Sequence, residues 1–183
     1  AQALSGYALA ARTQELRQGF IPLAGGHRLG VCGRMGPGGM TEISSLCVRM
    51  AHEIRGVGTA IFPQVRNRST LIAGPPGSGK TTLLRDLIRL HSEAGISVGV
   101  ADERGEIAGC FQGAPQLDVG PCCDVITGGN KAEALRLLLR AMSPRMLATD
   151  ELGAPGETAA LAEALRWGVR LLATVHGGGL CDL

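Results

Sequence analysis

The chain has 183 residues, of which 45% are hydrophobic and 19% charged, a balance typical of a folded α/β protein. A net charge of +2 and an aromatic content of 3% exclude a strong electrostatic footprint for nucleic acid and a base-stacking platform, although not a local basic patch. No apolar run is long enough to predict a membrane span. Because the chain starts without Met and stops soon after His176, we expect a piece of a longer protein.

The first third of the chain predicts a small antiparallel layer. A short helix, a strand, a turn, a returning strand and a connecting helix are expected at residues 5–17, 27–33, 36–39, 43–50 and 57–65. Residues 1–66 are therefore assigned to a partial N-terminal α+β domain.

The six cysteines include no C-x-x-C pair, so reduced thiols are the simplest interpretation. Cys32 and Cys47 fall in predicted strands and are expected to be small core residues. Adjacent Cys122 and Cys123 suit neither a disulfide between them nor a zinc knuckle. A metal or redox role for these two is the alternative.

From Thr70 onward, strand and helix patterns alternate, which is typical of a parallel sheet. Strands are predicted at 70–73, 96–101, 146–149 and 169–175, and helices at 80–93, 131–142 and 157–167. Residues 104–130 are rich in Gly, Pro and Cys and are expected to form a long functional loop. The predicted fold class is therefore α/β, with a mostly parallel central sheet at residues 67–183.

A glycine-rich loop between the first of these strands and its helix matches the G-x-x-x-x-G-K-T phosphate-binding pattern. Its glycines allow backbone N–H groups to point at phosphate oxygens, and the helix N-terminus adds positive potential. Lys80 is expected to reach the β- and γ-phosphates of ATP, and the Thr81 hydroxyl to bind Mg²⁺. The predicted nucleotide-binding residues are Gly74, Pro75, Pro76, Gly77, Ser78, Gly79, Lys80, Thr81 and Thr82.

Acidic and polar residues follow the later strands. Asp150 ends an apolar strand and suits the second magnesium-supporting position, while Glu151 is placed to act on the attacking water. The last strand brings Thr174 and His176 to the same edge, where a polar group can sense the γ-phosphate. These patterns favour the additional-strand branch of P-loop enzymes, in which the Asp150 strand is not the immediate neighbour of the glycine-loop strand.

Two other P-loop classes fit less well. Residues 102–105 match D-x-x-G and residues 130–133 nearly match N-K-x-D, as in a guanine-nucleotide switch. Glu133 is, however, one methylene longer than the base-reading aspartate, and one helix and one strand fill the interval where a switch loop belongs. A small P-loop kinase lacks support because no lid segment is evident.

Nearly the whole chain resembles the stage III sporulation protein AA family of endospore-forming bacteria. The resemblance is most specific in D-E-R-G-E-I-A-G at 102–109 and G-A-P-Q-L-D-V-G at 113–120. It is also carried by residues 16–20, 25–30, 44–49, 75–86, 142–144, 150–153 and 173–177.

This family is related to the type II and type IV secretion ATPases, which act as hexameric rings with a RecA-like nucleotide-binding domain. The resemblance therefore implies that residues 67–183 are a RecA/AAA-like P-loop NTPase core, truncated at its C-terminal end. The resemblance implies that Asp102, Glu103 and Glu106 correspond to an aspartate box and His176 to a histidine box, with Glu103 and His176 catalytic. It also places Arg49 like an arginine that reaches the γ-phosphate, in cis or in trans. Two departures stand out, because Cys122-Cys123 replace a usual Arg-Thr and Gly129-Asn130 a usual Cys-Pro.

The resemblance implies an ATPase that uses ATP and Mg²⁺ as a homo-oligomer, with membrane-embedded sporulation channel proteins as partners. The resemblance places the protein in the mother-cell cytoplasm. Any contact with the membrane is expected to run through those partner proteins. A nucleotide-gated assembly scaffold with little turnover and a nucleic-acid-associated ATPase are the alternatives.

Overall fold

The computed structural model describes residues 16, 19–36 and 39–177, which form two compact units. The first comprises residues up to His52 together with Gly109–Leu117, and the second comprises Glu53–Ala108 and the chain from Asp118 onward. The first unit thus ends before the change of pattern near residue 67, and it includes a segment from the middle of the chain. The predicted helix at 5–17 lies, apart from Leu16, outside the described residues.

The first unit is a three-stranded antiparallel sheet in the order β1-β2-β3, made of Phe20–Pro22, Arg28–Gly36 and Gly39–Arg49. Cross-strand partners share a face, and the pairs Ile21–Leu29 and Leu29–Val48 place apolar side chains together. Ile21, Leu29 and Val31 form its buried core. The predicted antiparallel layer is confirmed.

The opposite face of this sheet carries Cys32 and Cys47, and both side chains are exposed. Their prediction as core residues was wrong. β2 places Cys32 one position beyond the buried Val31, and successive side chains in a strand point to opposite faces.

Segment 109–117 folds back onto this unit. The Gln116 Oε1 accepts a hydrogen bond from the Gly25 N–H at 3.0 Å. Gly109 has φ +58°, and a Cβ there would lie 2.8 Å from the Gly26 Cα, so only glycine fits this close approach.

The second unit is built on a five-stranded parallel sheet in the order β4-β8-β7-β5-β6. The strands are β4 (Thr70–Gly74), β5 (Val98–Asp102), β6 (Cys123–Thr127), β7 (Met146–Thr149) and β8 (Arg170–His176). β8 separates β4 from β7, as the sequence predicted for the additional-strand branch. The predicted α/β fold class is confirmed.

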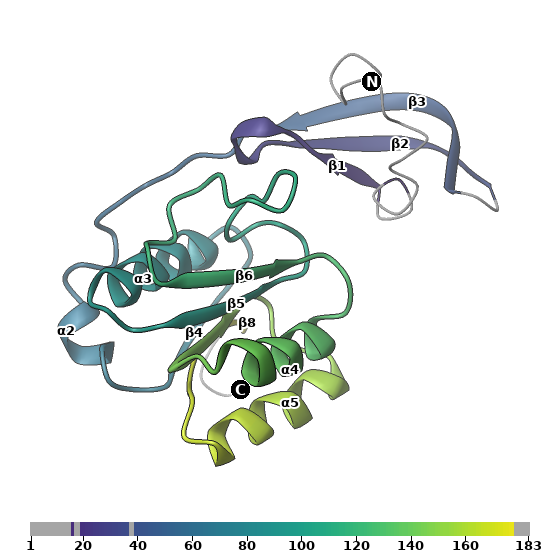
Figure 1. The fold of residues 1–183 in the computed structure, drawn as a ribbon. Helices are drawn as coiled ribbons and strands as arrows, with labels where there is room; N and C mark the ends of the chain where they lie inside the picture. Colours follow the sequence, from purple (N-terminus) through teal and green to yellow (C-terminus); the bar gives the residue numbers. More distant parts are fainter. Residues whose placement is uncertain (1–15, 17–18, 37–38, 178–183) are drawn as a thin grey trace. The chain divides into compact units, whose positions relative to one another are not determined.

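Helices cover both faces of this sheet (Figure 1). α3 (Lys80–Glu93) lies on one face, and α4 (Lys131–Met142) packs with α5 (Pro155–Arg166) on the other. Both inner helix faces are buried. In α3, Leu84, Leu87 and Ile88 have no exposed surface, and in α4, Leu135, Leu138 and Leu139 are each 1% exposed. The residue spacing that predicted these helices therefore also gave their buried faces.

Two predicted elements differ from the structure. β6 lies inside the expected loop 104–130, as an edge strand whose five residues all keep some exposure. Of the predicted helix at 57–65, only α2 (Phe62–Val65) forms. The Gly58 N–H instead donates to the Asp86 Oδ2 of α3 at 2.7 Å, which ties the connecting segment to that helix. Among the described residues, no helix combines the length and apolarity needed to cross a membrane.

The α4 core contact gives a matched test of stability. Leu138 is 1% exposed and its neighbour Leu137 is 50% exposed. We expect Leu138→Ala to lower the free energy of unfolding by about 2–5 kcal/mol through the cavity it leaves, and Leu137→Ala by about 0.5 kcal/mol or less. Urea denaturation of both variants measures the difference, and equal losses would contradict the packing of α4.

Candidate functional site

The glycine loop joins β4 to α3 at the carboxyl edge of the sheet. Gly77 and Gly79 have φ of +76° and +87°, a left-handed conformation that glycine adopts without a steric cost. A Cβ on Gly74 would lie 2.9 Å from the Ser78 Oγ, so a side chain there would displace the Ser78 hydroxyl. The Ser78 hydroxyl donates to the Pro75 carbonyl at 2.8 Å, which closes the turn.

Lys80 is buried at the start of α3, and its ammonium faces three acceptors. The Nζ donates to the carbonyl oxygens of Gly74 and Pro75, both at 2.8 Å, and lies 3.3 Å from the His176 Nδ1. An ammonium group can only donate, so the Nδ1 is the acceptor. The Nε2 is then the ring nitrogen that can donate a proton to a further partner.

The other side of the His176 ring meets Glu151. The Nε2 lies 3.1 Å from the Glu151 Oε1, and the second carboxylate oxygen accepts from the Arg104 Nη1 at 2.9 Å. A continuous line of polar contacts therefore runs from Lys80 through His176 and Glu151 to Arg104. The predicted residues Glu151 and His176 are brought together with the glycine loop.

These residues border a pocket of about 370 Å³ beside the glycine loop. Its lining comes from the glycine loop, the start of α3, the segments that follow β5 and β7, and the end of β8. The residues are Pro76, Gly77, Gly79, Lys80, Thr81, Thr82, Glu106, Glu151 and His176.

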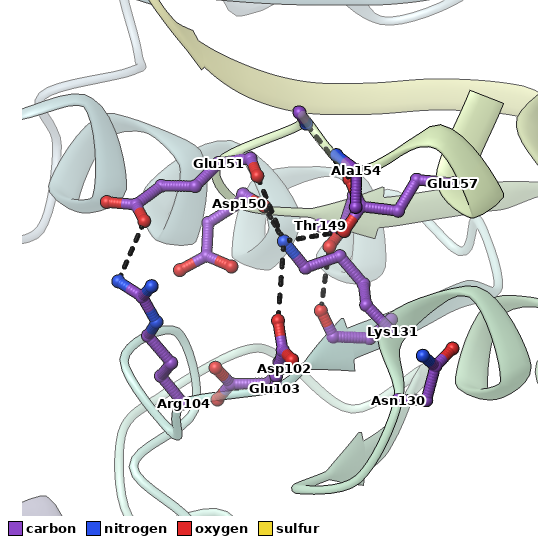
Figure 2. Close-up of polar contacts among 12 residues, drawn as sticks. Asp102, Glu103, Arg104, Asn130, Lys131, Thr149, Asp150, Glu151, Ala154 and Glu157 are labelled. Carbon is purple, nitrogen blue, oxygen red and sulfur yellow. Dashed lines mark hydrogen bonds and ion pairs between the residues drawn. The ribbon is translucent and has the colours of Figure 1, made fainter. Parts of the chain in front are cut away.

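The turn that carries Glu151 follows β7 and has an unusual backbone. Glu151 has φ +44°, which is disfavoured for a residue with a side chain. Its N–H donates to the Thr174 Oγ1 at 2.8 Å. The carbonyl oxygens of Asp150 and Glu151 accept from the Lys131 Nζ at 2.7 and 3.0 Å (Figure 2).

Asp150 is the first residue of this turn, and it is 3% exposed. Burial raises the pKa of Asp150 to about 7, the nearby Asp102 carboxylate adds to the rise, and the Lys131 ammonium opposes it. Carboxylate and hydroxyl oxygens suit Mg²⁺, so the Asp150 and Thr81 side chains fit the chemistry of a magnesium site that phosphates and waters complete. In the described part of the chain, no three His, Cys, Asp or Glu side chains gather as a metal site.

Asp102 orders the loop after β5. Its carboxylate accepts from the N–H groups of Glu106, Ile107 and Ala108 at distances of 2.8 to 3.2 Å. Burial raises the pKa of Asp102, and these hydrogen bonds limit the rise. From α3, the buried Arg85 donates to the Ile107 carbonyl at 2.5 Å and to the Glu106 carbonyl at 2.7 Å. This loop is held from both sides, with Glu106 at the glycine-loop pocket.

Glu103 faces a second, smaller pocket of about 190 Å³ that also contacts Asp150 and Glu151. Its Oε2 lies 3.8 Å from the Lys131 Nζ. Glu103 is thus absent from the lining of the glycine-loop pocket, in contrast to Glu106. Arg49 ends β3 in the first unit, where it is exposed.

Several polar side chains of the site were not identified from the sequence. They are Arg85, Arg104, Lys131 and Glu157. Lys131 left one signal, because a cation in the first turn of a helix opposes the helix dipole. For Arg104 and Glu157 no local sequence pattern indicated the contacts seen in the structure, because charged residues on an ordinary surface have similar sequence neighbours.

Comparison with known proteins places this geometry in a family. The family model described as "Sporulation stage III, protein AA" matches residues 1–183. The chain is 40% identical to "Stage III sporulation protein AA" of Bacillus subtilis over 193 aligned positions, covering 98% of this chain and 63% of the relative. The chain therefore spans about three fifths of the length of that relative.

Solved structures with the same fold include two bacterial ATPases. The Legionella pneumophila ATPase DotB superposes with a TM-score of 0.61 at 19% identity, covering 85% of this chain and 44% of DotB. The VirB11 ATPase of the Brucella suis type IV secretion system, solved with sulphate, gives 0.54 at 20% identity over 68% of this chain and 35% of VirB11. With the matched family model and the 40% identical relative, the chain belongs to the stage III sporulation protein AA family.

Proposed function

We propose that this chain binds and hydrolyses ATP as the motor subunit of a sporulation complex that resembles a secretion ATPase. The observation that carries the proposal is the line of contacts from Lys80 through His176 to Glu151 at one pocket. A lysine for phosphate and a carboxylate for water are groups that phosphoryl transfer to water uses, and His176 contacts both of them here.

The glycine loop, residues 74–82, would hold the phosphates through its backbone N–H groups, with Lys80 and Thr81 at the phosphates and the metal. Bound Mg²⁺ would supply charge neutralisation for the phosphates, and Asp150 would support it. To reach a phosphate, the Lys80 ammonium must exchange its carbonyl partners, Gly74 and Pro75, for phosphate oxygens. This exchange also releases the His176 Nδ1.

Glu151 would orient the attacking water and accept its proton. In the structure its carboxylate is already held by His176 and Arg104, so it needs little reordering to face the pocket. His176 would couple the position of the Lys80 ammonium to that of the Glu151 carboxylate, because its ring contacts both groups. Glu103 and Arg49 would assist catalysis, Arg49 by supplying positive charge to the γ-phosphate in cis or in trans.

Membership of the family supports a proposal for the biological setting. We propose that the chain works as a homo-oligomer, by resemblance a hexameric ring, in the mother-cell cytoplasm. It would energise a channel or secretion complex between mother cell and forespore, through membrane-embedded partner proteins.

The catalytic assignment is tested with Glu151→Gln. Removing the proton acceptor while keeping the side-chain shape is expected to lower kcat for ATP by about 10²–10⁴-fold and to leave Mg·ATP binding nearly unchanged. Turnover and binding are measured separately, by phosphate release and by titration calorimetry. Glu133→Gln, an exposed change on α4, is the matched control and should keep wild-type values.

Three outcomes discriminate among the roles. Undiminished turnover of Glu151→Gln would remove Glu151 from catalysis, and loss of binding as well would make it a structural residue. Wild-type turnover no faster than that of Lys80→Ala, with nucleotide binding intact only in wild type, would favour a nucleotide-gated scaffold.

The buried Asp150 carboxyl predicts a pH-dependent stability. The pKa of Asp150 in the folded chain, about 7, lies above the ordinary value of 3.8. The folded state is therefore most stable below pH 3.8, where Asp150 is protonated in both states. It loses stability as the pH rises from 3.8 to 7, and the loss is complete above pH 7. At about 1.4 kcal/mol per pKa unit, the loss is of the order of 4 kcal/mol. Asp150→Asn carries no ionisable group at this position and avoids the loss. The difference in melting temperature, variant minus wild type, should therefore increase between pH 5 and pH 8.

Thermal unfolding of both chains without Mg²⁺ or nucleotide, at several pH values, measures this trend. Glu133→Gln removes an exposed carboxylate and should show no such trend. A difference between Asp150→Asn and wild type that stays constant with pH would contradict the burial of an ionising Asp150.

A further inference from the structure

The sequence has two lysines, Lys80 and Lys131, and both are buried at the candidate site. Lys80 belongs to the glycine loop, whereas Lys131 begins α4 and does not line the glycine-loop pocket. An ammonium group buried without partners would be strongly destabilising. The partners of Lys131 therefore indicate what the residue is for.

Lys131 makes its shortest contacts with backbone, not with carboxylates. Its Nζ donates to the Asp150 and Glu151 carbonyls at 2.7 and 3.0 Å. The Glu157 carboxylate lies at 3.4 Å and is itself buried, whereas the half-exposed Glu103 lies at 3.8 Å. Charge compensation thus comes mainly from Glu157, and hydrogen bonding goes to the turn after β7.

Glu157 holds the other end of the same turn. Its Oε2 accepts from the N–H groups of Gly153 and Ala154 at 3.0 and 3.2 Å. Lys131 thus donates to two carbonyl oxygens at the start of the turn, and Glu157 accepts from two amide N–H groups at its end (Figure 2). The buried ion pair connects the two ends.

The centre of the turn is anchored from β8. The N–H groups of Glu151 and Leu152 donate to the Thr174 Oγ1 at 2.8 Å and to the Thr174 carbonyl at 2.9 Å. Three elements, α4, α5 and β8, therefore fix the backbone from Asp150 to Ala154. This matters because Glu151 has φ +44°, a conformation that persists only where surrounding contacts enforce it.

We propose that Lys131 and Glu157 are a positioning pair that fixes the turn at residues 150–154 and so aims the Glu151 carboxylate at the glycine-loop pocket. The inference rests on the proposed ATPase function of that pocket. Neither residue lines the pocket, so the pair acts through Glu151 and contacts no substrate. A small displacement of a reacting group is enough to lower turnover by about 10²-fold.

The experiment uses the full-length protein with Lys131→Met, Glu157→Gln and the double variant. Met keeps the length of the lysine and removes its donors, and Gln keeps an acceptor for the Gly153 and Ala154 amides. Arg140→Met is the matched control, since it removes a positive charge from the same helix at a side chain that is 66% exposed. Steady-state turnover, Mg·ATP binding and melting temperature are measured for each.

We expect Lys131→Met to lower kcat by about 10²-fold, with KM and Mg·ATP affinity within about threefold of wild type. Its melting temperature should fall because Glu157 is left buried without its cation. The double variant should regain much of that melting temperature and none of the kcat, since the carbonyls of the turn still lack a donor. Arg140→Met should match wild type.

Recovery of kcat along with melting temperature in the double variant would overturn the proposal, because the pair would then matter only for stability. Wild-type kcat in Lys131→Met, or a loss of nucleotide affinity equal to the loss of kcat, would overturn it as well. The proposed function fails separately, if wild type turns over no faster than Lys80→Ala, and the catalytic role of the pair fails with it. Hydrogen exchange of the Glu151–Ala154 amides, faster in Lys131→Met than in wild type, shows in either case whether the pair fixes the turn.

Discussion

The parallel arrangement of five strands is the constraint on which the candidate site depends. Parallel strands in one sheet end at the same edge, and the register pairs Gly74 with His176 and Asp102 with Thr127 at that edge. Residues distant in sequence thereby become neighbours, as Lys80 and His176 do. The edge also concentrates charge, because Lys80, Asp102, Lys131, Asp150 and Glu157 are all buried there.

That concentration explains the detailed hydrogen bonding around the site. Three of these buried charges have close polar partners: the glycine-loop carbonyls for Lys80, three backbone amides for Asp102, and the turn and Glu157 for Lys131. Because a buried charge that loses one partner is strongly destabilising, each of these contacts fixes a segment of backbone near the pocket. Electrostatic compensation and geometric order are thus provided by the same bonds.

Much of this arrangement could be predicted from the sequence, because its signals are local. The glycine loop, the helices at 80–93 and 131–142, and the strand ends at Asp150 and His176 follow from residue spacing and from the rule that parallel strands share an edge. What could not be predicted depends on tertiary contact. β6 is a short edge strand with little buried surface. The contacts of Arg104 and Lys131 span nineteen or more positions of the chain, and segment 109–117 joins the first unit through Gly109 and Gln116. The exposure of Cys32 and Cys47 depends on which face of the small sheet is covered.

The strand order has a consequence for the way the protein is made. β4 is an edge strand that pairs with β8, and β8 is the last strand along the described chain. During synthesis from the N-terminus, the glycine-loop strand therefore stays without its ladder partner until residues 170–176 have left the ribosome. Non-local pairing of this kind is slow to form, and the nucleotide motif exists as sequence well before it exists as a site. A nascent chain that ends before β8 carries every residue of the loop, yet it has neither the strand that supports the loop nor the His176 contact to Lys80.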